Sequence, residues 1–228
     1  MQNQFWRNKF FALSFVALTS VSGAVLTACA GDIAENPQSD TTTTQTSDHQ
    51  HLHHGGIDHA MDLGPADANY DLRFIDGMIL HHQGAIDMAE EALEKSQRPE
   101  IKQLAEEIIQ AQNQEIAQMQ SWRTAWYPDA GEQPMAYHAE MGHMMPMTAE
   151  QKQGMKMSMD LGAADEEFDL RFINGMIPHH EGAVVMAQDA LEKSQRPEIR
   201  NLSQEIIQAQ ESEINQMKQW RQAWFDTL

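Results

Sequence analysis

Apolar residues recur with the period of a helix through the middle of the chain. From residue 67 to residue 97, leucine, isoleucine, methionine and alanine mostly stand three or four positions apart, which gives one wide apolar face. The pattern breaks at Gln97-Arg98-Pro99, resumes after the proline, and ends near Tyr127-Pro128. The sequence therefore predicts two amphipathic helices of roughly 28 residues, the first capped by Asp67, folded as an antiparallel hairpin over residues 67–127.

The same pattern occurs a second time, 98 positions further along the chain. Residues 62–127 match residues 160–225, including a run of ten residues that is identical in both. An internal repeat of this kind indicates one supersecondary unit used twice. We therefore expect an all-α fold in which a second helical hairpin, residues 160–228, packs on the first to form one four-helix bundle, with residues 128–159 as a linker.

The N-terminal residues 1–28 have the layout of a secretory signal peptide, with Arg7 and Lys9, then an apolar run, then small residues. The segment ends in Leu26-Thr27-Ala28-Cys29, which resembles a bacterial lipobox, where the cysteine carries a lipid. The alternative is an ordinary cleavage site beside an incidental cysteine. Both interpretations place the protein in the periplasm or outside the cell, with a lipid on Cys29 as its only expected contact with a membrane.

Residues 29–66 show no apolar periodicity and include a run of four threonines, so we expect a disordered tether. The tether is rich in histidine toward its end, and a histidine-rich tract is a candidate for binding Cu(II), which imidazole suits. Its candidate ligands are His49, His51, His53, His54, His59 and Met61. The alternative is a solvated low-complexity segment with no role in metal binding.

Composition excludes several classes of function. The 228 residues contain 15 Lys and Arg against 34 Asp and Glu, a formal net charge of −19, which argues against binding to nucleic acid phosphates. The single cysteine excludes a disulfide framework and a cysteine-based zinc site. The 16 methionines and 11 histidines are unusually many, and if Cys29 is lipidated, soft-metal chemistry must use these two residue types.

Each predicted hairpin places a similar set of side chains in one layer. The first helix carries Met-x-x-His-His on its apolar face, where residues three or four positions apart lie together. If the turn centres near residues 97–98, the second helix brings a glutamine, a glutamate and a methionine opposite, and a buried glutamate needs a partner. The bundle should bring the layers of the two hairpins together near mid-length. The candidate metal ligands are Met78, His81, His82, Glu115, Met119, Met176, His179, His180, Glu213 and Met217.

Both layers can also be explained without metal binding. Methionine is a common core filler, and a buried neutral histidine can simply be hydrogen-bonded across a bundle. We favour metal ligation because the motif occurs twice with methionine attached.

The linker between the hairpins is a second concentration of methionine. Glycine and proline interrupt it, so we expect an irregular, exposed segment whose methionines are not core residues. Thioether sulfur is a soft, neutral ligand that favours Cu(I) and Ag(I). The candidate ligands are Met135, His138, Met141, His143, Met144, Met145 and Met147. The alternative is a linker that folds against the bundle with methionine as adaptable filler.

The stretch from Asp169 to Ala183, followed by Gln-x-x-Glu-Ile-x-x-Met at 210–217, resembles the signature of the bacterial family called domain of unknown function 305. The resemblance covers about residues 62–225, and its most specific part is the Met-x-x-His-His core. It implies a ferritin-like four-helix bundle. By likeness to the family's CopM-like secreted or periplasmic members, it also implies binding of copper or silver ions linked to metal tolerance.

Three functions compete at this point. The first is a cell-envelope protein that sequesters or shuttles Cu(I) and Ag(I), with copper ions and an envelope copper exporter or chaperone as partners. The second is a ferritin-like oxidase acting on copper or iron, which needs Glu-x-x-His, whereas methionine stands three positions before His81 and His179. The third is a structural bundle, which leaves the linker methionines unexplained. The sequence favours the first, a binding protein and not an enzyme.

Overall fold

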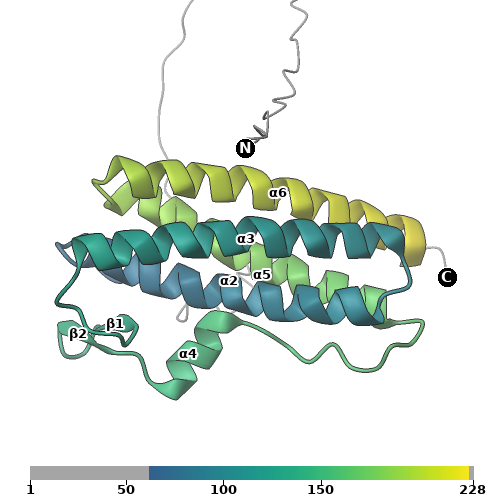
Figure 1. The fold of residues 1–228 in the computed structure, drawn as a ribbon, viewed down its shortest axis with the longest axis horizontal. Helices are drawn as coiled ribbons and strands as arrows, with labels where there is room; N and C mark the ends of the chain where they lie inside the picture. Colours follow the sequence, from purple (N-terminus) through teal and green to yellow (C-terminus); the bar gives the residue numbers. More distant parts are fainter. Residues whose placement is uncertain (1–61, 226–228) are drawn as a thin grey trace, which may run out of the picture. The chain divides into compact units, whose positions relative to one another are not determined.

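A computed structural model describes residues 62–225 of the chain (Figure 1). The expected signal peptide, the Cys29 lipid site and the histidine-rich segment at 49–61, with all of its candidate ligands, lie outside the described residues. The mainly helical class is confirmed. The elements in chain order are α2 Tyr70–Lys95, α3 Pro99–Trp126, β1 Met135–His138, β2 His143–Pro146, α4 Ala149–Lys156, α5 Phe168–Lys193 and α6 Pro197–Phe225.

The four long helices run side by side (Figure 1). Helix α2 packs along α3, and α5 packs along α6, so each repeat forms the hairpin that its sequence predicts. The two hairpins meet through α2 and α5, which carry the Met-x-x-His-His motifs. Within residues 62–225, no helix is long and apolar enough to cross a membrane.

The turn inside each hairpin has the same sequence, Ser-Gln-Arg-Pro, and the same geometry. The backbone N–H of Arg98 donates to Ser96 Oγ at 3.1 Å, and that of Arg196 donates to Ser194 Oγ at 3.2 Å. Pro99 then begins α3, where its fixed φ and missing N–H suit the first helical position. The short turn fixes which residues of the two helices face each other.

The arginine of each turn contacts the opposite hairpin. The Arg98 guanidinium lies 4.3 Å from the ring centroid of Trp224, and its Nε lies 3.3 Å from the carboxylate of Asp169. Arg196 lies 4.1 Å from the ring centroid of Trp126 in the mirrored contact. A cation is attracted to an aromatic face, so the same contact holds the paired hairpins together at two places.

The start of α2 differs from the prediction that Asp67 caps it. The helix begins at Tyr70, and the Asp67 carboxylate instead accepts hydrogen bonds from the Asn69 N–H and the Arg73 guanidinium, both at 2.9 Å. Arg73 is buried and also donates to the carbonyl of Leu63 at 2.6 Å. Because a buried guanidinium needs acceptors for its donors, the preceding chain wraps around it and the helix begins later.

The linker is not the irregular, exposed segment that its glycines and prolines suggested. Strands β1 and β2 pair as an antiparallel hairpin, and α4 follows with a capping box at its start. Met147 and Met155 are 5% and 6% exposed and pack in the core beside α2. The expectation of no core methionine in the linker is therefore wrong for these two, because the linker folds against the helices. Met141 and Met159 are exposed.

Candidate metal centre

The four histidines of the repeated motifs meet where α2 contacts α5. His81 and His179 lie against each other, with ring centroids 3.9 Å apart and the rings tilted by 48°. His179 and His180 have ring centroids 6.2 Å apart, edge to face. None of the four, His82 included, is more than 1% exposed. The prediction that the layers of the two hairpins come together is confirmed by the contact between His81 and His179.

Each hairpin joins a histidine to a glutamate across its two helices. His82 Nε2 lies 2.6 Å from Glu115 Oε2, and His180 Nε2 lies 2.6 Å from Glu213 Oε2. The position of the turn predicted that these glutamates lie opposite the histidine pairs, and the two contacts confirm it. A carboxylate on one ring nitrogen fixes the tautomer and the orientation of a metal-binding imidazole.

Five ring nitrogens of this layer have no hydrogen-bond partner in the described part of the chain: both of His81, and Nδ1 of His82, His179 and His180. A carboxylate or carbonyl oxygen only accepts, so a ring Nε2 bonded to one carries the proton and leaves the lone pair on Nδ1. For His179 the acceptor is the Lys156 carbonyl oxygen, 3.0 Å from Nε2. Because buried polar atoms are almost always paired, the layer has the character of a site that receives another group.

Burial keeps the two contacting histidines neutral. Desolvation, reinforced by the neighbouring histidines, lowers the pKa of His81 well below its ordinary value. Burial, with His180 nearby, lowers the pKa of His179 to about 3. At neutral pH both rings are therefore unprotonated, which is the state in which imidazole binds a metal.

The metal-free protein is expected to lose stability as the pH falls from about 6.5 toward 3, because the unfolded chain then binds protons at His81 and His179 that the folded protein does not bind. For His179 alone, the loss between pH 7 and pH 5 is about 2 kcal/mol. Urea unfolding at the two pH values measures this loss. The dependence on pH should become smaller in the His81→Leu variant, in which His179 remains, and should be unchanged in His143→Ala, which alters an exposed histidine. Equal stability of the wild type at both pH values would show that the rings of His81 and His179 are not buried in the neutral form.

The backbone of the linker lies directly against α2 at Gly84. A Cβ on Gly84 would lie 1.7 Å from the carbonyl oxygen of Lys156 and 3.1 Å from Nε2 of His179. A residue without a side chain therefore allows the Lys156 carbonyl to reach the His179 ring.

Gly84→Ala is expected to destabilise the protein by roughly 1–3 kcal/mol, because the new methyl group meets backbone that must move away. The displaced carbonyl should also release the His179 ring. Gly154→Ala is the matched control, since a Cβ there meets nothing within 4 Å. Thermal unfolding compares the two variants, and equal melting temperatures would show that the linker does not rest on α2.

The methionines of the two layers are buried in two groups. Met78 and Met119 belong to one core cluster, and Met176 and Met217 belong to the other; all four are fully buried. Met78 and Met176 each stand one turn before the histidine pair of their helix, on the same face. Each hairpin thus buries the methionine pair that its register predicts.

No three His, Cys, Asp or Glu side chains within residues 62–225 come close enough to hold a metal ion among themselves. The closest associations are pairs: His81 with His179, and each remaining histidine with its glutamate. Imidazole and thioether, the candidate ligands of this layer, are ligand types that soft ions accept.

The β-hairpin of the linker places one pair of predicted ligands directly opposite each other. His138 on β1 pairs with His143 on β2, so the two side chains share one face of the hairpin. Met145 lies on this face too, opposite Ala136. Met141 is exposed in the connecting turn, 59% accessible to solvent. This group lies apart from the remaining linker candidates.

The other linker candidates line two surface hollows. Met135 and Met147 line one hollow together with Met155, and Met144, with Met135 again, lines the other. His138, Met141, His143 and Met145 line neither of these two hollows.

His138→Ala together with His143→Ala is expected to weaken Cu(II) binding about tenfold or more in a chain from which residues 49–61 have been removed. Cross-strand Cβ atoms lie about 5 Å apart, so two imidazoles there can bind one Cu(II) ion. Met141→Leu, in the same hairpin, is the control and should bind Cu(II) as before. Titration followed by electron paramagnetic resonance measures the binding, and an unchanged affinity in the double variant would contradict the pairing.

Two methionines outside the predicted ligand set contact the motif helices. The methyl carbon of Met155 lies 3.4 Å from the place of a Cβ on Gly77, and the sulfur of Met159 lies 2.6 Å from the place of a Cβ on Gly175. These glycines directly precede the methionines of the two motifs. A glycine at the same place in both motifs indicated in the sequence that another side chain packs closely against the helix there. It did not identify that side chain.

The fold and this layer define a mainly helical protein in which five buried imidazole nitrogens have no partner among the described residues. Residues 71–221 match the family described as Domain of unknown function (DUF305). The match covers more than half of the chain, and the protein belongs to this family.

The chain is also similar to solved structures of the family. CopM in the Ag-bound form is 40% identical, with a TM-score of 0.54, over 68% of this chain and 97% of that chain. CopM in the Cu(I)-bound form is 40% identical, with a TM-score of 0.52 and the same coverage, 68% and 97%. A DUF305 fragment from Deinococcus radiodurans is 30% identical, with a TM-score of 0.50, over 68% of this chain and 96% of that one.

One curated relative shares a shorter stretch. An uncharacterized protein of Acanthamoeba polyphaga mimivirus is 41% identical over 49 residues, which is 22% of this chain. The match spans 32% of the length of that protein.

Proposed function

We propose that this protein binds Cu(I) and Ag(I) in the buried layer around His81 and His179. The observation that carries the proposal is the set of five buried ring nitrogens without partners in the described residues, on rings oriented by two glutamates and a backbone carbonyl. An unsatisfied buried polar group costs about 1–3 kcal/mol, and a bound cation removes that cost. The methionine one turn from each histidine pair favours soft monovalent ions over Zn(II) or Fe(II).

The ions bound in the structures of related proteins support this proposal. The CopM structures, 40% identical to this chain, include an Ag-bound and a Cu(I)-bound form. We propose that the fold is a ferritin-like four-helix bundle and that the protein sequesters or shuttles these ions, which contributes to copper tolerance. An envelope copper exporter or chaperone is the expected partner. The N-terminal sequence favours the cell envelope as its location, with a lipid on Cys29 as tether.

A ferritin-like oxidase acting on copper or iron is the alternative. Such enzymes hold their metals with glutamates and Glu-x-x-His on the bundle helices. Here methionine stands three positions before His81 and His179, and Glu115 and Glu213 are already bonded to histidines. These features favour a binding protein without a catalytic role.

Metal selectivity tests the proposal. The metal-free protein is exposed to equal concentrations of Cu(I), Zn(II), Fe(II) and Mn(II) under reducing conditions, and the metal that stays bound after gel filtration is measured by elemental analysis. We expect copper to be retained and the other metals to be lost. The control carries alanine at His81, His82, His179 and His180; it should keep its helical circular dichroism and retain less copper. Retention of iron or manganese in place of copper would favour the oxidase.

A further inference from the structure

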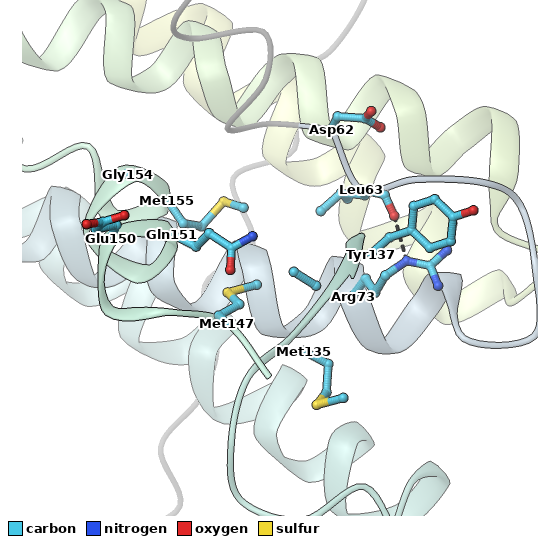
Figure 2. A pocket seen from close by; sticks show the side chains of 11 residues that line it. Asp62, Leu63, Arg73, Met135, Tyr137, Met147, Glu150, Gln151, Gly154 and Met155 are labelled. Atoms are coloured by element: carbon cyan, nitrogen blue, oxygen red, sulfur yellow. Dashed lines mark hydrogen bonds between the residues drawn. The ribbon is translucent and has the colours of Figure 1, made fainter. Parts of the chain in front are cut away.

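A surface hollow of about 300 Å³ lies against α2, bordered by β1, α4 and the segment that precedes α2 (Figure 2). Its lining includes three thioethers, those of Met135, Met147 and Met155. Figure 2 shows Met147 and Met155 next to Gln151, on the α4 side of the hollow. None of the four buried histidines lines this hollow.

Met147 and Met155 belong both to the hollow and to the core. They line the hollow, yet they are buried and pack in the same cluster as Met78. The methyl carbon of Met155 lies 3.4 Å from the place of a Cβ on Gly77, the residue before Met78. The thioethers of Met147 and Met155 and the thioether of Met78 are therefore parts of one packed cluster.

Helix α4 connects the hollow to the histidine layer. Glu150, Gln151 and Gly154 line the hollow, whereas the carbonyl of Lys156, at the other end of the helix, accepts the hydrogen bond from His179 Nε2 at 3.0 Å. An eight-residue helix is about 12 Å long, so the hollow and the histidines are a short distance apart.

The charges of the hollow suit a cation. The carboxylates of Asp62 and Glu150 line it, and carboxylates around a recess raise the local concentration of cations. Arg73 also lines the hollow, but its guanidinium is engaged by the carbonyl of Leu63 at 2.6 Å and by the carboxylate of Asp67 at 2.9 Å. The Asp67 carboxylate offsets the positive charge of Arg73.

We propose that this hollow is the entrance through which a soft monovalent cation reaches the buried histidines, with Met147 and Met155 passing it inward to Met78. The inference rests on the proposed function, because it names the path to the same site. Each step is a ligand exchange: the cation forms a bond to one sulfur as it leaves another, and it stays monovalent throughout. Thioethers suit such transfer because they are neutral and bind without releasing a proton.

The test removes both sulfurs and keeps the volume. In the Met147→Leu, Met155→Leu variant, leucine replaces methionine with little change in packing. Stopped-flow absorbance follows Cu(I) leaving a coloured Cu(I) chelator for the metal-free protein, and one trace gives both the rate and the final occupancy. We expect the rate to fall about tenfold or more while the final occupancy stays the same. The control, Met88→Leu, makes the same change at a buried methionine of α2 outside this hollow and should leave the rate unchanged.

Three results would contradict the proposal that this hollow is the entrance. The first is an unchanged rate in the Met147→Leu, Met155→Leu variant, and the second is an equal slowing in the control. The third is a loss of final occupancy, which would show that these sulfurs are ligands of a resident metal and not a path to it. A wild type that takes up no Cu(I) contradicts the proposed function itself.

A second variant avoids the core. Glu150 is exposed, so Glu150→Gln leaves the packing intact. Uptake by this variant should be slower than in the wild type at low salt, and the difference should shrink at high salt, because salt screens the attraction of the carboxylate. Equal rates for the two proteins at low salt would speak against the hollow as the entrance.

Discussion

Replacing His81 by leucine is expected to stabilise the metal-free protein and, at the same time, to weaken its binding of Cu(I). Both ring nitrogens of His81 are buried without a partner in the described chain. Leucine has a similar volume and no polar atom, so we expect the free energy of unfolding to rise by about 1–2 kcal/mol. The same change removes one imidazole ligand from the proposed site, and we expect the dissociation constant for Cu(I) to rise about a hundredfold.

Two measurements separate these effects. Urea unfolding of the metal-free protein gives the stability, and competition with a Cu(I) chelator gives the affinity. The matched control is His138→Leu, which changes a half-buried histidine of the β-hairpin and should alter the Cu(I) affinity little. A His81→Leu protein that is less stable than the wild type but binds Cu(I) equally well would identify His81 as a structural residue.

Glu115→Gln together with Glu213→Gln should weaken Cu(I) binding about ten- to a hundredfold, with the fold retained. The amide oxygen can still accept the hydrogen bond from His82 or His180, so the shape of the layer is kept. The negative charge, which makes the imidazole a better donor to a metal, is lost. The side chains of both glutamates are about one-fifth exposed, so neither amide is sealed in the core.

Competition titration with a Cu(I) chelator measures this effect as well. Glu106→Gln with Glu205→Gln is the matched control, because these glutamates lie exposed on the same two helices, α3 and α6. The control should bind Cu(I) as the wild type does. If both double variants lose affinity equally, the effect comes from net charge, and the contacts to His82 and His180 have no special role.

The sequence predicted the hairpins and one contact of the site for a definite physical reason. Apolar periodicity marked the helices, and Ser-Gln-Arg-Pro marked a turn too short to let the register vary. Once the turn is fixed, the residue opposite His82 follows from counting along the two helices. The predicted neighbour, Glu115, lies 2.6 Å from His82 Nε2.

The linker could not be predicted in the same way, because tertiary contacts determine its structure. Nothing local in Met147 or Met155 distinguishes a core methionine from an exposed one such as Met141. The acceptor for His179 is a backbone carbonyl, that of Lys156, and a backbone group leaves no mark in the sequence. The β-hairpin likewise separates ligands that the sequence could only group together.

The location of bound copper tests the central claim most directly. Crystals of the protein loaded with Cu(I) under reducing conditions would give an anomalous difference map at the copper absorption edge. We predict a copper peak within bonding distance of ring nitrogens of His81 and His179, with the Glu115 and Glu213 contacts to their histidines kept. Copper found only on the β-hairpin or in the surface hollow, with none bound to the five ring nitrogens that lack a partner among the described residues, would contradict this account.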